Sequence, residues 1–310
     1  METPKFIENN IPTIAMLSSY KKWGLLSRTF MLRENSLNLM DLYNGTGKYS
    51  EYNEEIRVFL ISRIYLELFE RLCQSIEDLT GIIFSLQNDL SKFQEKIISP
   101  PNPQNVLKKL TKEKWNELLR YCDIESLPLE SADRDLILTV RERNITVLQK
   151  YTQLIDNFIN LYWVIYNKLK HGNTLMYGFS QSEVNGERAI FIPAFYNSKE
   201  PEKVKELMVT QSIYKKWQNL FDTTITLTED LISTNLEYLE RLGKPFLIKT
   251  TYGSIDKSEY EHLLNLQKVY EKGTEKFNIN VLVEAEIKEA SINRHIDFYN
   301  KFDLGAFNKK

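Results

Sequence analysis

The sequence predicts a mostly α-helical fold, in which long amphipathic helices form a bundle that carries one small β-hairpin. Apolar residues recur in steps of three and four over residues 51–98 and 131–171, which is the spacing of an amphipathic helix. Residues 174–195 instead alternate apolar and polar side chains around Asn185-Gly186, a pair typical of a two-residue hairpin turn. These two patterns predict the fold class.

Length and composition are those of a chain that can bury a large core. The chain has 310 residues, 42% of them hydrophobic, and we expect a single helical domain over residues 1–310. Forty lysines and arginines stand against 42 aspartates and glutamates, which gives a formal net charge of −2. No overall basic field therefore attracts the chain to nucleic acid or to a membrane, and any such binding has to come from a local site.

The sequence predicts a cytoplasmic protein. Its N-terminus lacks the basic start and the apolar core of a signal peptide, and no apolar run approaches the ~20 residues that a membrane-spanning helix requires. Cys73 and Cys122 lack CxxC spacing, so we expect both to be buried thiols in a reducing compartment. No membrane partner is expected.

The N-terminal third is predicted to be helical. A lead-in over residues 1–47 is expected to be loose up to residue 12 and to end in a turn at Asn44-Gly-Thr-Gly47. One long helix follows over residues 51–98, in which Gly81 is a candidate bend, because glycine inside a helix costs about 1 kcal/mol relative to alanine. The prolines of residues 99–103 are expected to end this helix.

Two more helices are predicted in the middle of the chain. Thr111 is the expected N-cap of a short helix that carries Trp115 and Leu118 on its apolar face. After a linker at residues 125–131, a longer helix runs to His171 and is followed by Gly172, a C′ residue suited to the left-handed conformation. The predicted apolar stripe of this helix is Val140, Val147, Leu154, Phe158, Leu161 and Ile165, and Asn144 and Tyr151 bring polar atoms into it.

The predicted hairpin, residues 174–195, follows the histidine directly and is a candidate wall of any site there. Pro201 is the expected first-turn residue of another helix, which runs to residue 242. The rest is a C-terminal extension over residues 244–310, with an ambiguous extended run at 246–252 and helices at 254–270 and 275–302.

Titratable and polar side chains gather at the end of the helix over residues 131–171. His171 is one of only three histidines, and in the last turn the negative end of the helix dipole favours its protonated form. At about 100° per residue, the polar and apolar side chains of this stretch fall on opposite sides of the helix. The polar side consists of Gln149, Gln153, Asp156, Asn160, Asn167 and His171, and the apolar side of Leu154, Phe158, Leu161, Ile165 and Leu169.

Motifs of the commonest enzyme classes are absent from the sequence, which has no GxGxxG fingerprint, no Walker-type loop and no nucleophile elbow. A single Glu-x-x-His step runs from Glu259 to His262, whereas a di-iron bundle site needs two such steps and two further glutamates. His262 and His295 lie in charged stretches and are expected to be solvated. We therefore predict no metal and no cofactor.

The stretch Tyr166-Asn-Lys-Leu-Lys-His171 resembles the HEPN superfamily of helical-bundle proteins. The motif of that family is an arginine followed, after four to six residues, by a histidine, often with a polar residue directly after the arginine. Asn167 matches the polar position and His171 matches the histidine. Tyr166 stands where the family has its arginine, so the resemblance is to a divergent member and covers roughly residues 50–175 by pattern.

The resemblance implies a helical bundle that forms a homodimer and, in active members, cleaves RNA without a metal, in a toxin, stress or phage-defence setting. A histidine that titrates near neutrality serves as general acid or base, and the arginine grips phosphate oxygens. By this resemblance His171 is the catalytic proton-transfer group and Asn167 its orienting neighbour. Lys170, Lys168 and Tyr166 are the candidate substrate contacts, although tyrosine supplies no positive charge and Lys168 points toward the apolar edge.

Two other functions are consistent with the sequence. The first is a non-catalytic protein-interaction module, in which His171 and Asn167 only cap the helix. The second is a binding protein with a pocket beneath the hairpin for a nucleotide or another small anion. Binding of RNA through phosphates weakens steeply with salt, whereas a protein interface buries apolar surface, so salt dependence separates these functions.

Overall fold

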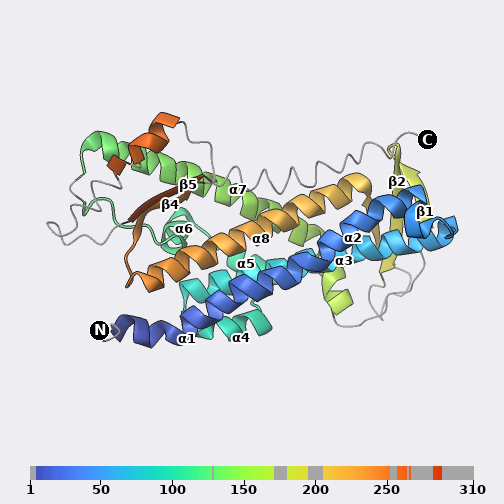
Figure 1. Ribbon diagram of the computed structural model, residues 1–310, viewed down its shortest axis with the longest axis horizontal. Coiled ribbons are helices and arrows are strands. Elements are labelled where there is room, and N and C mark those ends of the chain that lie inside the picture. Colours follow the sequence, from blue (N-terminus) through green and yellow to red (C-terminus); the bar gives the residue numbers. More distant parts are fainter. Residues whose placement is uncertain are drawn as a thin grey trace. The chain divides into compact units, whose positions relative to one another are not determined.

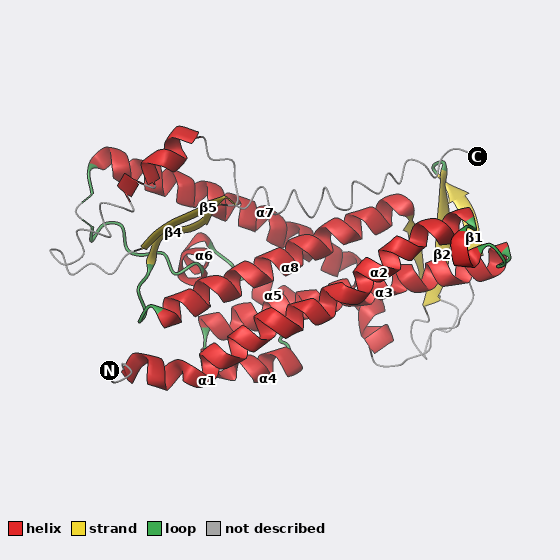
Figure 2. Ribbon diagram, viewed as in Figure 1, coloured by secondary structure: helices red, strands yellow, loops and turns green. Residues whose placement is uncertain are grey.

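The computed structural model of the chain is mostly α-helical, with a small antiparallel sheet, which confirms the predicted fold class (Figures 1 and 2). It describes residues 5–127, 129–170, 180–194, 205–251, 257–263, 265–266 and 282–287.

The described residues divide into two compact units. Unit 1 contains those within Met1–Leu25, Glu77–Leu154 and Ile225–Phe298, and unit 2 those within Leu26–Ile76 and Ile155–Thr224. Each of the three longest helices is divided between the units, with one segment in unit 1 and the other in unit 2. This division leaves the single-domain prediction open.

The chain begins with α1 (Lys5–Ser19), a π-helical turn η1 (Tyr20–Gly24) and α2 (Leu25–Asn44). The loose lead-in predicted up to residue 12 is therefore wrong from Lys5 onward. Residues 9–12 are exposed or half-buried, and the helix that contains them is anchored further on, where Leu17 of α1 is fully buried in an apolar cluster with Ile82 and Phe93. The predicted turn after Asn44 is confirmed: Gly45 and Gly47 have φ angles of 62° and 56°, which glycine adopts without strain.

The long helix predicted over residues 51–98 is two helices. After a 3-10 turn η2 (Gly47–Tyr49), α3 (Glu54–Gln87) ends before a second 3-10 turn, η3 (Leu90–Lys92), and α4 (Phe93–Ile98) follows. Asp89 starts the new segment by accepting a hydrogen bond from the Ser91 backbone N–H at 3.0 Å. A Cβ atom on Gly81 would lie 2.5 Å from the Lys96 carbonyl oxygen, so this glycine permits α4 to pack closely on α3 and does not mark a bend.

Two short helices follow, α5 (Pro103–Leu107) and α6 (Lys112–Leu118). The predicted N-cap is confirmed, because the Thr111 side chain accepts a hydrogen bond from the Lys114 backbone N–H at 3.3 Å. Trp115 and Leu118 are buried as expected.

The helix predicted from residue 131 is confirmed as α7 (Ser131–Lys170), and its predicted apolar stripe is confirmed in part: Val140, Phe158 and Ile165 are buried. Leu154 and Leu161 are 54% and 71% exposed. Apolar residues make up half of this helix, so periodicity alone does not determine which side of it is buried. Four further residues are buried, each directly after a residue of the predicted stripe: Leu148, Ile155, Ile159 and Tyr166.

The predicted hairpin turn is confirmed. Asn185 and Gly186 have φ angles of 53° and 79° and join β1 (Ser180–Val184) to β2 (Glu187–Ala194). The first predicted strand, residues 174–179, lies outside the described residues.

A third strand, β3 (Lys205–Thr210), pairs antiparallel with β2, so the helix predicted from Pro201 is wrong over residues 205–210 and α8 covers only Gln211–Glu240. Leu207 and Val209 are buried alternately, which a strand satisfies and a helical face does not. Pro201 itself lies outside the described residues.

The C-terminal extension is only partly helical. The ambiguous run after Pro245 is β4 (Phe246–Thr251), and residues 257–263 are helical within a predicted helix. The helix predicted over residues 275–302 is wrong at β5 (Leu282–Ile287), which pairs parallel with β4. The run Val283-Glu-Ala-Glu-Ile287 alternates apolar and acidic residues, as a strand does. Among the described helices, none has an apolar stretch sufficient to cross a lipid bilayer.

Candidate functional site

The candidate site predicted from the sequence lies at the C-terminal end of α7, in unit 2. Asn167 and Lys170 are exposed there, three positions apart on the last turn. Tyr166, by contrast, is only 3% exposed. His171 and the side chain of Lys168 lie outside the described residues, so their roles stay predictions.

A lysine charge is held beside the position where the HEPN motif has its arginine. The ammonium nitrogen of Lys170 lies 5.8 Å from the ring centroid of Tyr166, one helical turn earlier, within the distance of a cation–π contact. The ring of Tyr166 in turn packs against Trp163, at 5.0 Å between centroids. Two buried or half-buried aromatic rings therefore support a cationic side chain that is itself exposed.

An aromatic cluster anchors this part of α7 to α3 and α8 within unit 2. Phe69 of α3 is fully buried, and its ring centroid lies 5.3 Å from that of Trp217 and 5.9 Å from that of Phe158. Tyr162 completes the cluster, with centroid distances of 5.0 Å to Phe158 and 5.4 Å to Trp217. Such contacts fix the rotation of α7 about its own axis, and so determine which of its side chains face outward.

A hydrogen-bonded pair of tyrosines, of which Tyr65 is buried and Tyr43 half-buried, lies elsewhere in unit 2. The hydroxyl groups of Tyr43 and Tyr65 are hydrogen-bonded to each other, and the Tyr65 ring lies 4.8 Å from that of Tyr214. Burial raises the pKa of Tyr43 to about 12 and the pKa of Tyr65 well above its usual value. Both hydroxyls therefore stay protonated near neutral pH, which suits a structural hydrogen bond and not proton transfer.

The sheet is tied to the helices of unit 2 by charged side chains. Arg188 of β2 pairs with Glu54 of α3 at 3.0 Å, and Gln181 of β1 donates a 3.4 Å hydrogen bond to the same carboxylate. Glu187 accepts hydrogen bonds from Ser212 at the start of α8. The pKa of Glu187 is lowered from its usual value, chiefly by the hydrogen bond from the Ser212 side chain. The described part of the hairpin thus contacts α3 and α8, and its predicted role as a wall for His171 stays a prediction.

Asp222 of α8 is the most perturbed carboxylate in this unit. One of its oxygens is buried without a hydrogen-bond partner, and burial raises its pKa from 3.8 to about 7. The folded protein therefore binds a proton at Asp222 more tightly than the unfolded chain does. Stability that is present near pH 4 is lost as the pH rises toward and through 7.

The substitution Asp222→Asn is expected to stabilise the protein above pH 7 and to change its stability little near pH 4. The amide removes the cost of a buried charge, a cost that grows with pH as the carboxyl loses its proton. Urea denaturation of both proteins at pH 4.5, 6 and 8 measures the difference. Asp135→Asn on the exposed side of α7 is the surface control, and a constant difference across the pH series would contradict the assignment.

The described residues offer no metal centre. No cluster of three or more histidine, cysteine, aspartate or glutamate side chains occurs among them. The Glu-x-x-His step is instead engaged in pairing: Glu259 forms a bidentate ion pair with Arg143 at 2.7 and 2.9 Å, and His262 contacts Asp133 at 2.6 Å. His295 lies outside the described residues.

Sequence reasoning missed the two features of unit 2 with the most strongly shifted pKa values, the Tyr43–Tyr65 pair and Asp222. No local signal marks the tyrosine pair, because its members are 22 residues apart. The sequence pattern did not mark Asp222 either, because it lies about 100° around the helix axis from its apolar neighbour Phe221. Comparisons with known proteins found no matching family model, no matching curated protein and no matching solved structure.

Proposed function

We propose that this chain is a HEPN-like protein that binds RNA at the end of α7, with Lys170 supplying the positive charge that the family obtains from arginine. His171, the next residue, is the proposed proton-transfer group for metal-independent cleavage, with Asn167 and Lys168 beside it. The proposed setting is the cytoplasm, in a toxin, stress or defence role. A reducing compartment agrees with Cys73 and Cys122, which are both buried thiols and not part of a disulfide.

One observation carries the proposal: the contact between the Lys170 ammonium and the Tyr166 ring. It supports a cation at the position where the motif needs one, although Tyr166 is itself uncharged. Lysine offers a point charge and not the bidentate fork of arginine, so it binds phosphate with weaker orientation. Phosphate binding is therefore better supported than fast cleavage.

The test is binding and cleavage of a labelled mixed RNA pool without added metal. Lys170→Ala is expected to weaken binding and to reduce the slope of log affinity against log salt by about 0.7–0.9, the loss of one phosphate contact. His171→Ala is expected to abolish cleavage and to retain most of the binding. Lys150→Ala, an exposed lysine about 30 Å away along the same helix, is the matched control.

The outcomes are distinguishable. Binding that Lys170→Ala and Lys150→Ala weaken equally would show general electrostatics and would remove the proposed site. Binding lost with Lys170 but no cleavage by the wild type would leave an RNA-binding protein without nuclease activity. The absence of both, in a protein that folds normally, would contradict the proposal.

A second candidate function, a non-catalytic helical interaction module, has its own support in a face of α7 that also suits the homodimer implied by the HEPN resemblance. Every described exposed residue of α7 from Asn157 to Asn167 is uncharged, and two of them, Leu161 and Val164, are apolar. A face without charges can pack against its own copy without placing like charges together. Sedimentation analysis of wild type and Leu161→Glu tests it: the wild type is expected to be a dimer and the variant a monomer.

A further inference from the structure

One stripe of side chains runs along about four turns of α7 and ends at the proposed RNA site. Its members follow each other in steps of four and three residues, which places them above one another on the helix surface. Each of them is exposed or half-buried. The stripe consists of Asp156, Asn160, Trp163, Asn167 and Lys170. An indole ring therefore stands at the centre of a stripe that is otherwise polar or charged.

Trp163 keeps part of its side chain at the surface of unit 2. Its ring packs against Tyr166, with 5.0 Å between the centroids and 49° between the ring planes. Tyr166 is only 3% exposed, whereas Trp163 is half-buried. The buried tyrosine thus gives the indole a fixed neighbour. A rigid aromatic ring that is partly packed and partly accessible offers a flat surface on which a ligand ring can stack.

Lys170 places a positive charge near the same buried ring. Its ammonium nitrogen lies 5.8 Å from the ring centroid of Tyr166, and it is seven residues, or about 10.5 Å along the helix axis, from Trp163. The indole and the ammonium group therefore contact one ring from two successive turns of the stripe. They are close enough for one nucleic-acid strand to place a base on the indole and a phosphate at the ammonium group.

The remaining members of the stripe suit the same ligand. Asn160 and Asn167 flank Trp163, and an amide side chain both donates and accepts hydrogen bonds, as the edges of unpaired bases require. Asn160 also donates a 3.2 Å hydrogen bond to Asp156, which lies at the end of the stripe opposite Lys170. A carboxylate repels phosphate, so the charges of the stripe direct the phosphates of a strand to the Lys170 end.

We propose that Trp163 is a base-binding residue of this site, on which an unpaired RNA base stacks while Lys170 holds a phosphate of the same strand. The inference rests on the proposed RNA binding and adds what that site selects. A base within a duplex is stacked on both faces and does not reach a side-chain ring, so the site takes single-stranded segments. Every base has a flat face, so stacking on Trp163 tolerates many sequences.

The test measures binding of the full chain to an unstructured, labelled RNA of about 12 nucleotides by fluorescence anisotropy. The same RNA annealed to its complement is the second ligand, and a strand of equal length without bases is the third. The single strand is expected to bind at least about tenfold more tightly than either of the others. General electrostatics predicts the opposite order for the duplex, because its phosphates are more closely spaced.

Replacing Trp163 separates stacking from charge. Trp163→Leu is expected to weaken binding of the single strand by about 5- to 150-fold, the effect of one lost base–aromatic stack, and Trp163→Phe to retain most of the affinity. The slope of log affinity against log salt is expected to stay unchanged in both variants, because no phosphate contact is lost. If Trp163 only held Tyr166 and Lys170 in place, Trp163→Leu would lower this slope as Lys170→Ala does, and the proposal would fail.

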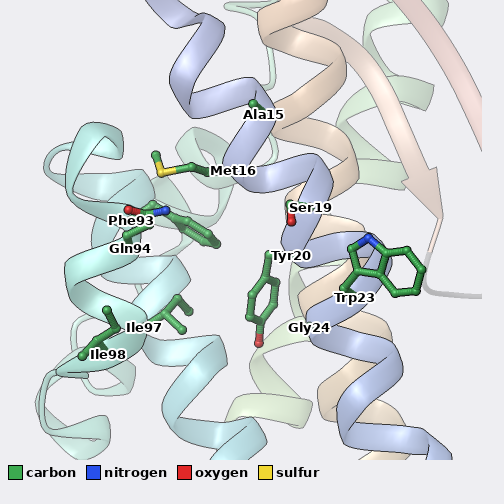
Figure 3. Close-up of a pocket in the computed structure, with 10 residues that line it drawn as sticks. All are labelled: Ala15, Met16, Ser19, Tyr20, Trp23, Gly24, Phe93, Gln94, Ile97 and Ile98. Atoms are coloured by element: carbon green, nitrogen blue, oxygen red, sulfur yellow. The ribbon is translucent and has the colours of Figure 1, made fainter.

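Trp23 of unit 1 provides the matched control, because it is an exposed tryptophan outside the stripe. It is 59% exposed and lies at an open groove between α1–η1 and α4 that is lined mostly by apolar side chains (Figure 3). The Lys22 ammonium lies over the Trp23 ring, 4.9 Å from its centroid, and so competes with a base for that face. Trp23→Leu is therefore expected to leave the RNA affinity unchanged. Circular dichroism and sedimentation verify that each variant folds and associates as the wild type does.

Three results would overturn the role of Trp163: equal affinity for the single strand and for the strand without bases, equal losses with Trp163→Leu and Trp163→Phe, or a loss with Trp23→Leu that matches the loss with Trp163→Leu. If Trp163→Leu changes nothing while Lys170→Ala weakens binding and lowers the salt slope, the RNA site stands and the stacking role fails. If the wild type binds no RNA, the RNA site fails and the stacking role fails with it.

Discussion

Replacing Arg141 by methionine is expected to lower the free energy of unfolding by about 3–5 kcal/mol. The guanidinium is buried in unit 1. It connects α7 to β4 and to the segment that precedes α7 in the chain. It donates to the carbonyl oxygens of Leu247 and Cys122, both at 2.9 Å, and of Phe246 at 3.3 Å. A hydrogen bond from a charged donor contributes about 1.5–3 kcal/mol, and each acceptor left buried without a donor adds a penalty.

Arg141 also makes packing contacts along its side chain. The guanidinium carbon lies 4.6 Å from the ring centroid of Tyr121, and one nitrogen donates to the Cys122 sulfur at 3.2 Å. Methionine retains much of the volume, so the measured loss reports on the hydrogen bonds. Arg141→Lys is expected to be intermediate, because an ammonium group retains the charge but cannot reach the same set of acceptors at once.

Urea denaturation followed by circular dichroism measures this loss. Arg134→Met is the control, because Arg134 pairs with the exposed Glu125 at 3.1 Å and a surface pair is worth at most about 1 kcal/mol. Equal effects of Arg141→Met and Arg134→Met would contradict the assigned role of the buried guanidinium.

Removal of the Phe69 ring is the second substitution with a large expected effect. Phe69→Ala is expected to destabilise the protein by about 3–5 kcal/mol, since it deletes a fully buried ring at the centre of the aromatic cluster of unit 2. Its contacts with Phe158, Tyr162 and Trp217 each contribute about 0.5–1.5 kcal/mol beyond the buried area.

Phe59→Ala provides a matched control on the same helix. Phe59 is 40% exposed, so its truncation is expected to cost about 1 kcal/mol or less. Similar losses for the two phenylalanines would mean that the cluster does not hold the helices together.

The same data test the single-domain prediction, because Arg141 lies in unit 1 and Phe69 in unit 2. If both substitutions shift one common transition, the two units unfold together. If each shifts a separate transition, the chain has two domains.

The sequence by itself determined the elements whose signals are local. The Thr111 cap, the glycine turn after Asn44 and the Asn185-Gly186 turn are each specified by the conformational preferences of one to four neighbouring residues, and all three are present. The extent of α7, from Ser131 to at least Lys170, follows from periodicity sustained over many turns.

The same holds for part of the candidate site. Asn167 and Lys170 are exposed at the end of α7, as the helical pattern and the cluster of polar residues there predict. The resemblance to the HEPN motif is also a property of the sequence, and its functional meaning awaits the RNA experiment.

Tertiary structure decided the rest, because it depends on contacts between residues far apart in the chain. Leu207 continues the apolar stripe of the following helix by pattern, and pairing with β2 makes residues 205–210 a strand. Gly81 is equally compatible with a bend and with a close approach, and the position of the Lys96 carbonyl settles it. The rotation of α7 about its own axis follows from the packing of Phe158 and Tyr162 around Phe69, and this rotation leaves Leu161 exposed. A local pattern limits the conformations open to a segment, whereas the burial of its side chains against distant partners selects among them.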